Sequence, residues 1–174
     1  MSRPSAAADV RRMAPEDANE LVILRREALE QAPLAFGSSL QDDRGLSVDF
    51  VRSALEQRDE QAVFGYYSAG VLSGMAGLVR ETKLKSRHKA FVWGMYVSAH
   101  ARGTGAGRAL VQAVVAHARS WSGVEQVHLS VSATAVEAGA LYTSMGFHAW
   151  GREPRALQWE GRFVDEIHLA LRLV

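Results

Sequence analysis

The sequence predicts an α/β protein in which helices cover both faces of a mixed β-sheet. Two observations carry this prediction. Segments with apolar residues at helical spacing alternate with short β-prone runs along the chain. Three strand-like runs follow one another in the middle of the chain, and helix–strand alternation comes after them. A meander followed by such crossings places parallel and antiparallel pairs in one sheet.

The N-terminal part is expected to contain one short strand and two helices. Pro15 opens the first helix, because proline suits the first helical turn and the acids that follow suit the positive end of the helix dipole. Ser47 is a typical N-cap residue and begins the second helix. In order, the expected elements are a strand over residues 9–13, a helix from residue 15 to the run 32–37, and a helix after residue 47.

The rest of the chain alternates more regularly. The run 90–97 is apolar on both faces, which is typical of a central strand. The expected elements are strands over residues 62–67, 71–79 and 90–97, a helix over 104–120, a strand over 124–131, a helix over 136–145, and closing strands over 148–153 and 163–171.

The composition indicates a single globular domain over residues 1–174. The absence of cysteine excludes a disulfide framework, a thiolate zinc site and a cysteine nucleophile. A formal net charge of +1 argues against a nucleic-acid partner. The chain contains no signal-like or membrane-spanning apolar run, so a cytoplasmic protein is expected. The histidines show no metal-binding spacing, and no metal is expected.

A glycine-rich turn lies between the buried strand and the long amphipathic helix. Glycines let the backbone approach a ligand, and the free N–H groups at a helix start attract phosphate. The turn fits neither the dinucleotide fingerprint G-x-G-x-x-G nor a P-loop. A phosphate-bearing ligand is one interpretation, and a plain strand-to-helix turn is the other.

The turn resembles the Q/R-x-x-G-x-G/A motif of the GNAT (Gcn5-related N-acetyltransferase) superfamily, and the strand before it ends Met95-Tyr96-Val97, as in that family. The resemblance implies a GNAT fold with six to seven strands and about four helices. It also implies that acetyl-CoA contacts Met95, Tyr96, Val97, Arg102, Gly103, Thr104, Gly105, Ala106, Gly107 and Arg108. For the side chains of Arg102 and Arg108, phosphate contact and plain solvation both remain open.

A second motif, residues 138–147, resembles the family's A-x-x-L-Y-x-x-x-G-F. The resemblance makes Tyr142 the expected catalytic residue, because a phenol can protonate or stabilise the departing CoA thiolate. A tyrosine that only packs in the core is the alternative. Two departures stand out: Ala135 replaces a frequent asparagine, and residues 89–97 carry no carboxylate base. By residue type alone, the candidate bases are Glu81, Glu137, Glu153, Glu166 and His168.

The expected function is direct transfer of an acetyl group from acetyl-CoA to a primary amine of a small molecule or a protein. The last hairpin, with Trp150–Arg155 and Asp165-Glu166, is expected to border the acceptor. Phe36 is expected either to border it too or to be a capping residue of the core. Two alternatives are a catalytically silent acyl-CoA-binding module and a dehydrogenase-type nucleotide-binding protein. A homodimer formed through sheet edges is a further open expectation.

Overall fold

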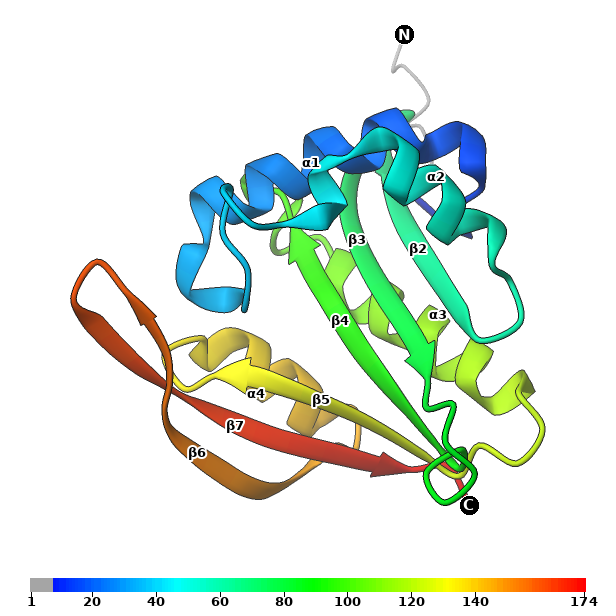
Figure 1. The fold of residues 1–174 in the computed structure, drawn as a ribbon, viewed down its shortest axis with the longest axis vertical. Coiled ribbons are helices and arrows are strands. Elements are labelled where there is room, and N and C mark those ends of the chain that lie inside the picture. The colour runs from blue at the N-terminus through cyan, green and yellow to red at the C-terminus, as the bar shows by residue number, and fades with distance from the viewer. Residues whose placement is uncertain (1–7) are drawn as a thin grey trace, which may run out of the picture.

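A computed structural model describes residues 8–174 and shows one mixed sheet of seven strands in the order β1-β2-β3-β4-β5-β7-β6 (Figure 1). The strands are β1 (Asp9–Arg12), β2 (Gln61–Ser68), β3 (Val71–Arg80), β4 (Lys89–Val97), β5 (Gln126–Ser132), β6 (His148–Trp159) and β7 (Arg162–Arg172). Within the described range, only β4 and β5 pair in parallel. The predicted mixed sheet is confirmed. Residues 1–7 of the expected domain lie outside the described range.

Four α-helices pack on this sheet: α1 (Ala18–Gln31), α2 (Val48–Glu56), α3 (Ala106–Ser120) and α4 (Val136–Ser144). Short 3-10 turns lie at η1 (Pro15–Asp17), η2 (Pro33–Ala35), η3 (Arg44–Leu46) and η4 (Ala99–Ala101). Helices α1 and α2 cover one face of β2, β3 and β4, and α3 covers the other (Figure 1). The core is therefore divided into two clusters, with the sheet between them. None of the helices in residues 8–174 is long and apolar enough to cross a membrane.

Local signals set most helix starts. The Ser47 hydroxyl accepts a hydrogen bond from the Phe50 N–H at 3.3 Å, as the N-cap prediction requires. Pro15 opens a 3-10 turn first, and the α-helix proper begins three residues later at Ala18. Asp17 ties this turn down, because its carboxylate accepts from the Ala14 N–H at 2.8 Å.

Besides the later start of α1, the predicted starts of α3 and β5 and the predicted end of β6 were wrong, β5 beginning at Gln126 rather than at residue 124. Helix α3 begins at Ala106 rather than at residue 104, because Gly103 and Gly105 have φ values of 74° and 89° that no α-helix contains. Strand β6 continues to Trp159, six residues beyond the predicted end. The charged stretch after residue 152 hides this strand in the sequence, and an irregular register between Glu153 and Leu157 interrupts its pairing with β7.

The sheet parts in its middle. Strands β4 and β5 share only three pairs of residues, of which Phe91 and His128 form the last. Beyond Phe91, β4 stays paired with β3 as far as Val97, whereas β5 follows β7. The two halves of the sheet therefore diverge, and one edge of β4 is left without a neighbouring strand (Figure 1).

Candidate functional site

A cleft of about 760 Å³ lies where β4 and β5 diverge. Its walls come from the end of β4, the glycine-rich turn with the start of α3, and the beginning of α4. The predicted site residues that line it are Met95, Tyr96, Val97, Arg102, Gly103, Gly105, Ala106, Gly107, Arg108 and Tyr142. Two motifs more than thirty residues apart in sequence thus face one space.

Thr104 is the one predicted contact that does not line the cleft. Its hydroxyl donates to the Ala101 carbonyl at 2.7 Å and lies 3.3 Å from the Tyr66 hydroxyl. Thr104 therefore fastens the turn to the sheet rather than facing the cleft.

The turn presents backbone N–H groups to the cleft. Gly105 is the N-cap of α3, and no side chain caps the helix there. The first N–H groups of the helix consequently lack an intrahelical acceptor. A Cβ at Gly103 or Gly105 would meet no atom within 4 Å, so the positive φ rather than crowding demands glycine. At Gly107 a Cβ would come within 3.1 Å of Leu141, which keeps α3 close to α4. This end of α3 is suited to an anion.

The two arginines of the turn each donate one hydrogen bond within the protein. Arg102 donates from Nε to the Val97 carbonyl at 3.0 Å, and Arg108 donates from Nη2 to the Ser144 hydroxyl at 3.0 Å. Both residues are exposed at the edge of the cleft. Each keeps further N–H donors for an anionic group.

Strand β4 contains a bulge at Gly94, two residues before Tyr96. Gly94 has a φ of 63°, and the β3–β4 register shifts beside it. Tyr96 is buried toward α1, where its hydroxyl donates to the Glu27 carboxylate at 3.0 Å. Burial and this hydrogen bond raise the pKa of Tyr96 to about 12. Its side chain is engaged in the core, so its contribution to the cleft is its backbone.

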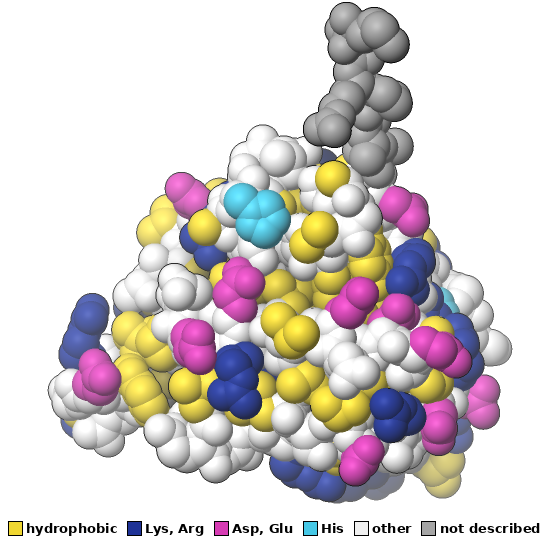
Figure 2. Space-filling model, turned by 90° about the horizontal axis from the view of Figure 1, so that it is seen from above, with side chains coloured by type: hydrophobic (Ala, Val, Ile, Leu, Met, Phe, Trp, Pro, Cys, Tyr) yellow, Lys and Arg dark blue, Asp and Glu magenta, His cyan; other side chains and the backbone are white. Residues whose placement is uncertain are grey.

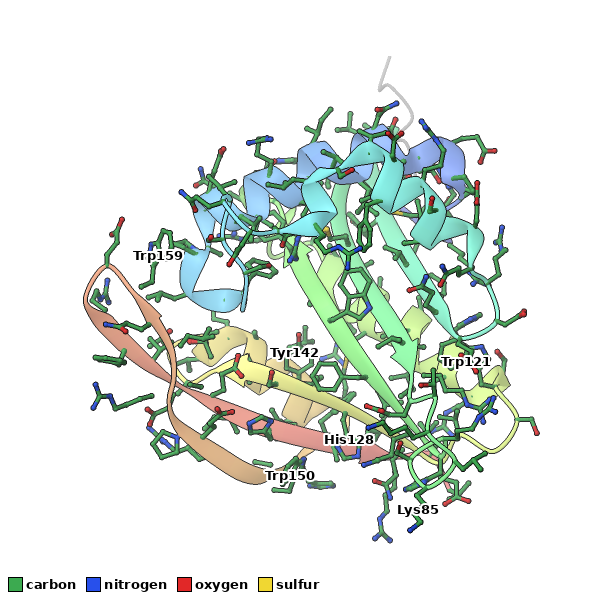
Figure 3. The ribbon with its side chains drawn as sticks, in the orientation of Figure 1. Lys85, Trp121, His128, Tyr142, Trp150 and Trp159 are labelled. Carbon is green, nitrogen blue, oxygen red and sulfur yellow. The ribbon has the colours of Figure 1, made fainter. Side chains whose placement is uncertain are left out.

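Tyr142 lies in the opening between β4 and β5 (Figure 3). Its ring is 5% exposed and packs edge-on against Phe147, with centroids 5.9 Å apart. Its hydroxyl makes no hydrogen bond to any residue of the described chain. Burial raises the pKa of Tyr142 to about 12, so the phenol keeps its proton at neutral pH. The side chain is both a core residue and a free donor at the cleft.

The departures from the family motif have local consequences. Ala135 lines the cleft but has no polar side chain, and its backbone N–H donates a hydrogen bond to the Ser132 carbonyl at 2.9 Å. The adjacent Thr134 also lines the cleft, with its hydroxyl 2.8 Å from that of Ser132. Of the five candidate bases, only Glu137 lines the cleft.

The other candidate bases lie elsewhere. Glu81 and His168 border a cavity of about 170 Å³, together with His128 and Trp150. Glu153, Glu166 and His168 bring three possible ligand atoms within 4.8 Å of one another on the β6–β7 hairpin, away from the cleft. The sequence reasoning named these residues singly and missed the trio, which appears only when the register pairs the strands. The expectation of no metal stays a prediction.

A second cavity, of about 590 Å³, lies between residues 29–42 and residues 157–160 at the tip of the β6–β7 hairpin. Phe36 lines it and also belongs to the buried core cluster under α1, whereas the hairpin contributes Leu157 to Glu160 rather than Trp150–Arg155. A contact of Phe36 with the acceptor stays a prediction. Asp165, also expected near the acceptor, lines neither this cavity nor the cleft, and its carboxylate accepts from Arg152 Nε at 2.8 Å and from the Arg155 N–H at 2.8 Å. The wall of this cavity could not be found from the sequence, because the true end of β6 was missed.

Comparison with solved structures supports the fold. An acetyltransferase of the GNAT family from Streptococcus pneumoniae is 21% identical with a TM-score of 0.86, over 96% of this chain and 100% of that one. A GCN5-related N-acetyltransferase from Kribbella flavida is 25% identical with a TM-score of 0.81, over 96% and 98%. A Salmonella typhimurium protein, whose structure contains its cofactor acetyl-CoA, is 20% identical with a TM-score of 0.83, over 97% and 95%.

No curated protein matches the chain. The family described as Acetyltransferase (GNAT) family matches residues 23–147. That match covers more than half of the 174 residues and includes both motifs of the cleft. The chain therefore belongs to the GNAT acetyltransferase family.

Proposed function

We propose that this protein is an N-acetyltransferase that moves the acetyl group of acetyl-CoA directly to a primary amine. The observation that carries the proposal is the parting of β4 and β5 beyond Phe91, which opens a cleft bordered by the glycine-rich turn and by Tyr142. Family membership and the acetyl-CoA in the Salmonella relative support the choice of cosubstrate. The dehydrogenase-type alternative is dropped, because the chain belongs to the acetyltransferase family.

The proposed binding mode follows from the free backbone groups. The pyrophosphate of acetyl-CoA would accept hydrogen bonds from the first N–H groups of α3, where the helix dipole favours negative charge. Arg102 and Arg108 would add charge at the rim. The amides of pantetheine would pair with the free edge of β4 near Met95 and Val97, as an added strand does.

The proposed reaction is a single acyl transfer in a ternary complex. The amine nitrogen attacks the thioester carbonyl carbon and forms the C–N bond, while the C–S bond breaks and CoA leaves as a thiolate. The nitrogen loses one proton to water or to a base. The sequence contains no cysteine that could carry the acetyl group as a thioester. Tyr142 would donate a hydrogen bond to the sulfur as negative charge develops there.

The binding half of the proposal is tested by calorimetric titration of acetyl-CoA into the native protein and into Gly105→Glu. A carboxylate at the helix start would repel the pyrophosphate, and we expect the dissociation constant to rise at least about tenfold. Gly70→Glu is the matched control, because Gly70 also has a positive φ (79°) and open space around it but lies outside the cleft. Native protein that binds no acetyl-CoA would refute the proposal.

The catalytic half separates the enzyme from a silent binding module. An amine panel incubated with acetyl-CoA and a thiol reagent should show release of free CoA that depends on the amine. Tight acetyl-CoA binding without release for any amine would favour the silent module, which the missing strand carboxylate and Ala135 would permit.

A further inference from the structure

We propose that the amine acceptor carries a second positive charge, which is held in the cavity between residues 29–42 and 157–160 while the reacting amine lies at the cleft. This inference rests on the proposed function and specifies its substrate class. We call this space the acidic cavity. Its volume of about 590 Å³ is that of a small-molecule site.

The charge of the acidic cavity has one sign. Its lining includes the carboxylates of Glu30, Asp42 and Glu160, and it includes no lysine, arginine or histidine. The chain as a whole is balanced, with 20 basic and 19 acidic residues, so this bias is local. Figure 2 shows both acidic and basic side chains near a hollow with apolar side chains, on the side where the β6–β7 tip lies, and of these charged side chains only acids line the cavity. Such a concave, singly charged lining favours a cation.

Asp42 is held in its charged form. One carboxylate oxygen, Oδ1, accepts from the Ser39 N–H at 2.6 Å and from the Ser39 hydroxyl at 2.9 Å. These hydrogen bonds lower the pKa of Asp42 below its ordinary value. The other oxygen, Oδ2, receives no hydrogen bond within residues 8–174 and can accept one from an ammonium group.

The segment after α1, which carries Asp42, is held in place by its neighbour Asp43. Arg25 binds Asp43 at 2.6 Å, and its guanidinium lies 4.7 Å from the centre of the Phe36 ring. Ser38 bonds to the same Asp43 carboxylate. Because Arg25 is paired with Asp43, its charge does not cancel the acids of the cavity.

Apolar side chains make up the rest of the lining. They include Leu29 and Phe36 from the α1 side and Leu157 and Trp159 from the hairpin. Trp159 projects from the hairpin end toward the segment after α1 (Figure 3). The methylene chain of an amine can pack on such surfaces while its ammonium group meets the carboxylates.

The position of the acids relative to the cleft decides whether they bind the reacting nitrogen of the acceptor or a second nitrogen. Ala32 lines the cleft and the next residue, Pro33, lines the acidic cavity, so the two spaces meet at the η2 turn. None of the three carboxylates lines the cleft. An amine must be neutral to attack the thioester, and among the described residues Glu137 is the one acid that lines the cleft where it would react. The acids are therefore suited to a second nitrogen, away from the reacting one.

The test compares acceptors that differ only in that second charge. Linear α,ω-diamines of increasing length are assayed against monoamines in which a methyl group replaces the second ammonium. We expect kcat/KM to be roughly 10- to 100-fold higher for the best diamine, mainly through KM, which is the range for one charged hydrogen bond. A second arm uses short peptides with an N-terminal amine followed by lysine or by leucine, which separates small-molecule from peptide acceptors.

Variants tie the preference to the cavity. In Glu30→Gln/Asp42→Asn/Glu160→Gln, we expect the diamine advantage over the matched monoamine to fall to about twofold or less. Glu56→Gln, an exposed acid at the end of α2 outside the cavity, is the matched control and should keep the preference.

Two results would overturn the inference: equal kcat/KM for paired diamines and monoamines in the native enzyme, or a preference that survives the triple variant. Calorimetric titration of the diamine into the CoA-bound protein gives a readout without turnover. If no amine is acetylated, the proposed function fails, yet diamine binding that the triple variant abolishes would still support the cavity assignment. The cavity assignment would be overturned if the diamine showed no binding in the calorimetric titration and no advantage over monoamines in the turnover assay.

Discussion

Replacement of Tyr142 by phenylalanine isolates the contribution of one hydroxyl group to acetyl transfer. The ring is 5% exposed and would keep its contact with Phe147. The hydroxyl has no hydrogen-bond partner within the described chain, so its removal leaves no partner unsatisfied. We therefore expect the free energy of unfolding of Tyr142→Phe to change by less than about 1 kcal/mol. The variant should fold and bind acetyl-CoA normally.

The size of the catalytic effect follows from proton affinities. Burial raises the pKa of Tyr142 to about 12, whereas a thiol like that of CoA has a pKa of about 8.5. The difference, 12 − 8.5 = about 3.5 units, means that complete proton transfer from Tyr142 to the thiolate would cost about 5 kcal/mol. Tyr142 is thus better suited to a hydrogen bond with the departing sulfur than to full donation. Such a bond to a charged group contributes about 1.5–3 kcal/mol.

The expected loss in kcat for Tyr142→Phe is accordingly roughly 10- to 150-fold. The assay is release of free CoA at saturating amine, with the dissociation constant of acetyl-CoA measured separately by calorimetry. Tyr67→Phe is the control, because Tyr67 is also buried, has a pKa raised to about 12 mainly by burial, and lies outside the cleft. A kcat for Tyr142→Phe within about twofold of native would refute the role, as would a loss explained by weaker acetyl-CoA binding.

Two further predictions concern the framework of the site. Gly77→Ala should destabilise the protein by about 1–3 kcal/mol in denaturant unfolding, because the added Cβ would lie 2.2 Å from the Trp93 ring, whereas Gly151→Ala, in open space, should not. Burial disfavours the charged imidazole and lowers the pKa of His117 in the folded protein. The contribution of His117 to stability is complete above the pKa of the unfolded chain, and it is lost as the pH falls through the lower pKa of the folded protein. Between pH 7.5 and 5.5 the free energy of unfolding of the native protein should fall through this group, and that of His117→Gln should fall less; equal slopes would contradict this.

The alternation of periods along the chain was enough to predict the mixed sheet and its covering helices. Each element depends mainly on its own side-chain pattern, as with the Ser47 cap and the apolar run of β4. The hidden end of β6 was missed for the same reason. Its residues after Arg152 lack an alternating pattern, because this edge strand is largely exposed and held by pairing with β7.

The glycine-rich turn was recognisable in the sequence, because a positive φ and a helix start impose local demands that only certain residues meet. Tyr142 was named through the resemblance of residues 138–147 to the family motif. What the sequence by itself determined was therefore the fold class and most of the residues that line the cleft. The tertiary structure alone decided that β4 and β5 part beyond Phe91, that Thr104 faces the sheet, and that the segment after α1 meets the tip of the β6–β7 hairpin. These features come from strand pairing and packing between segments far apart in the chain, and such contacts leave no local pattern in the sequence.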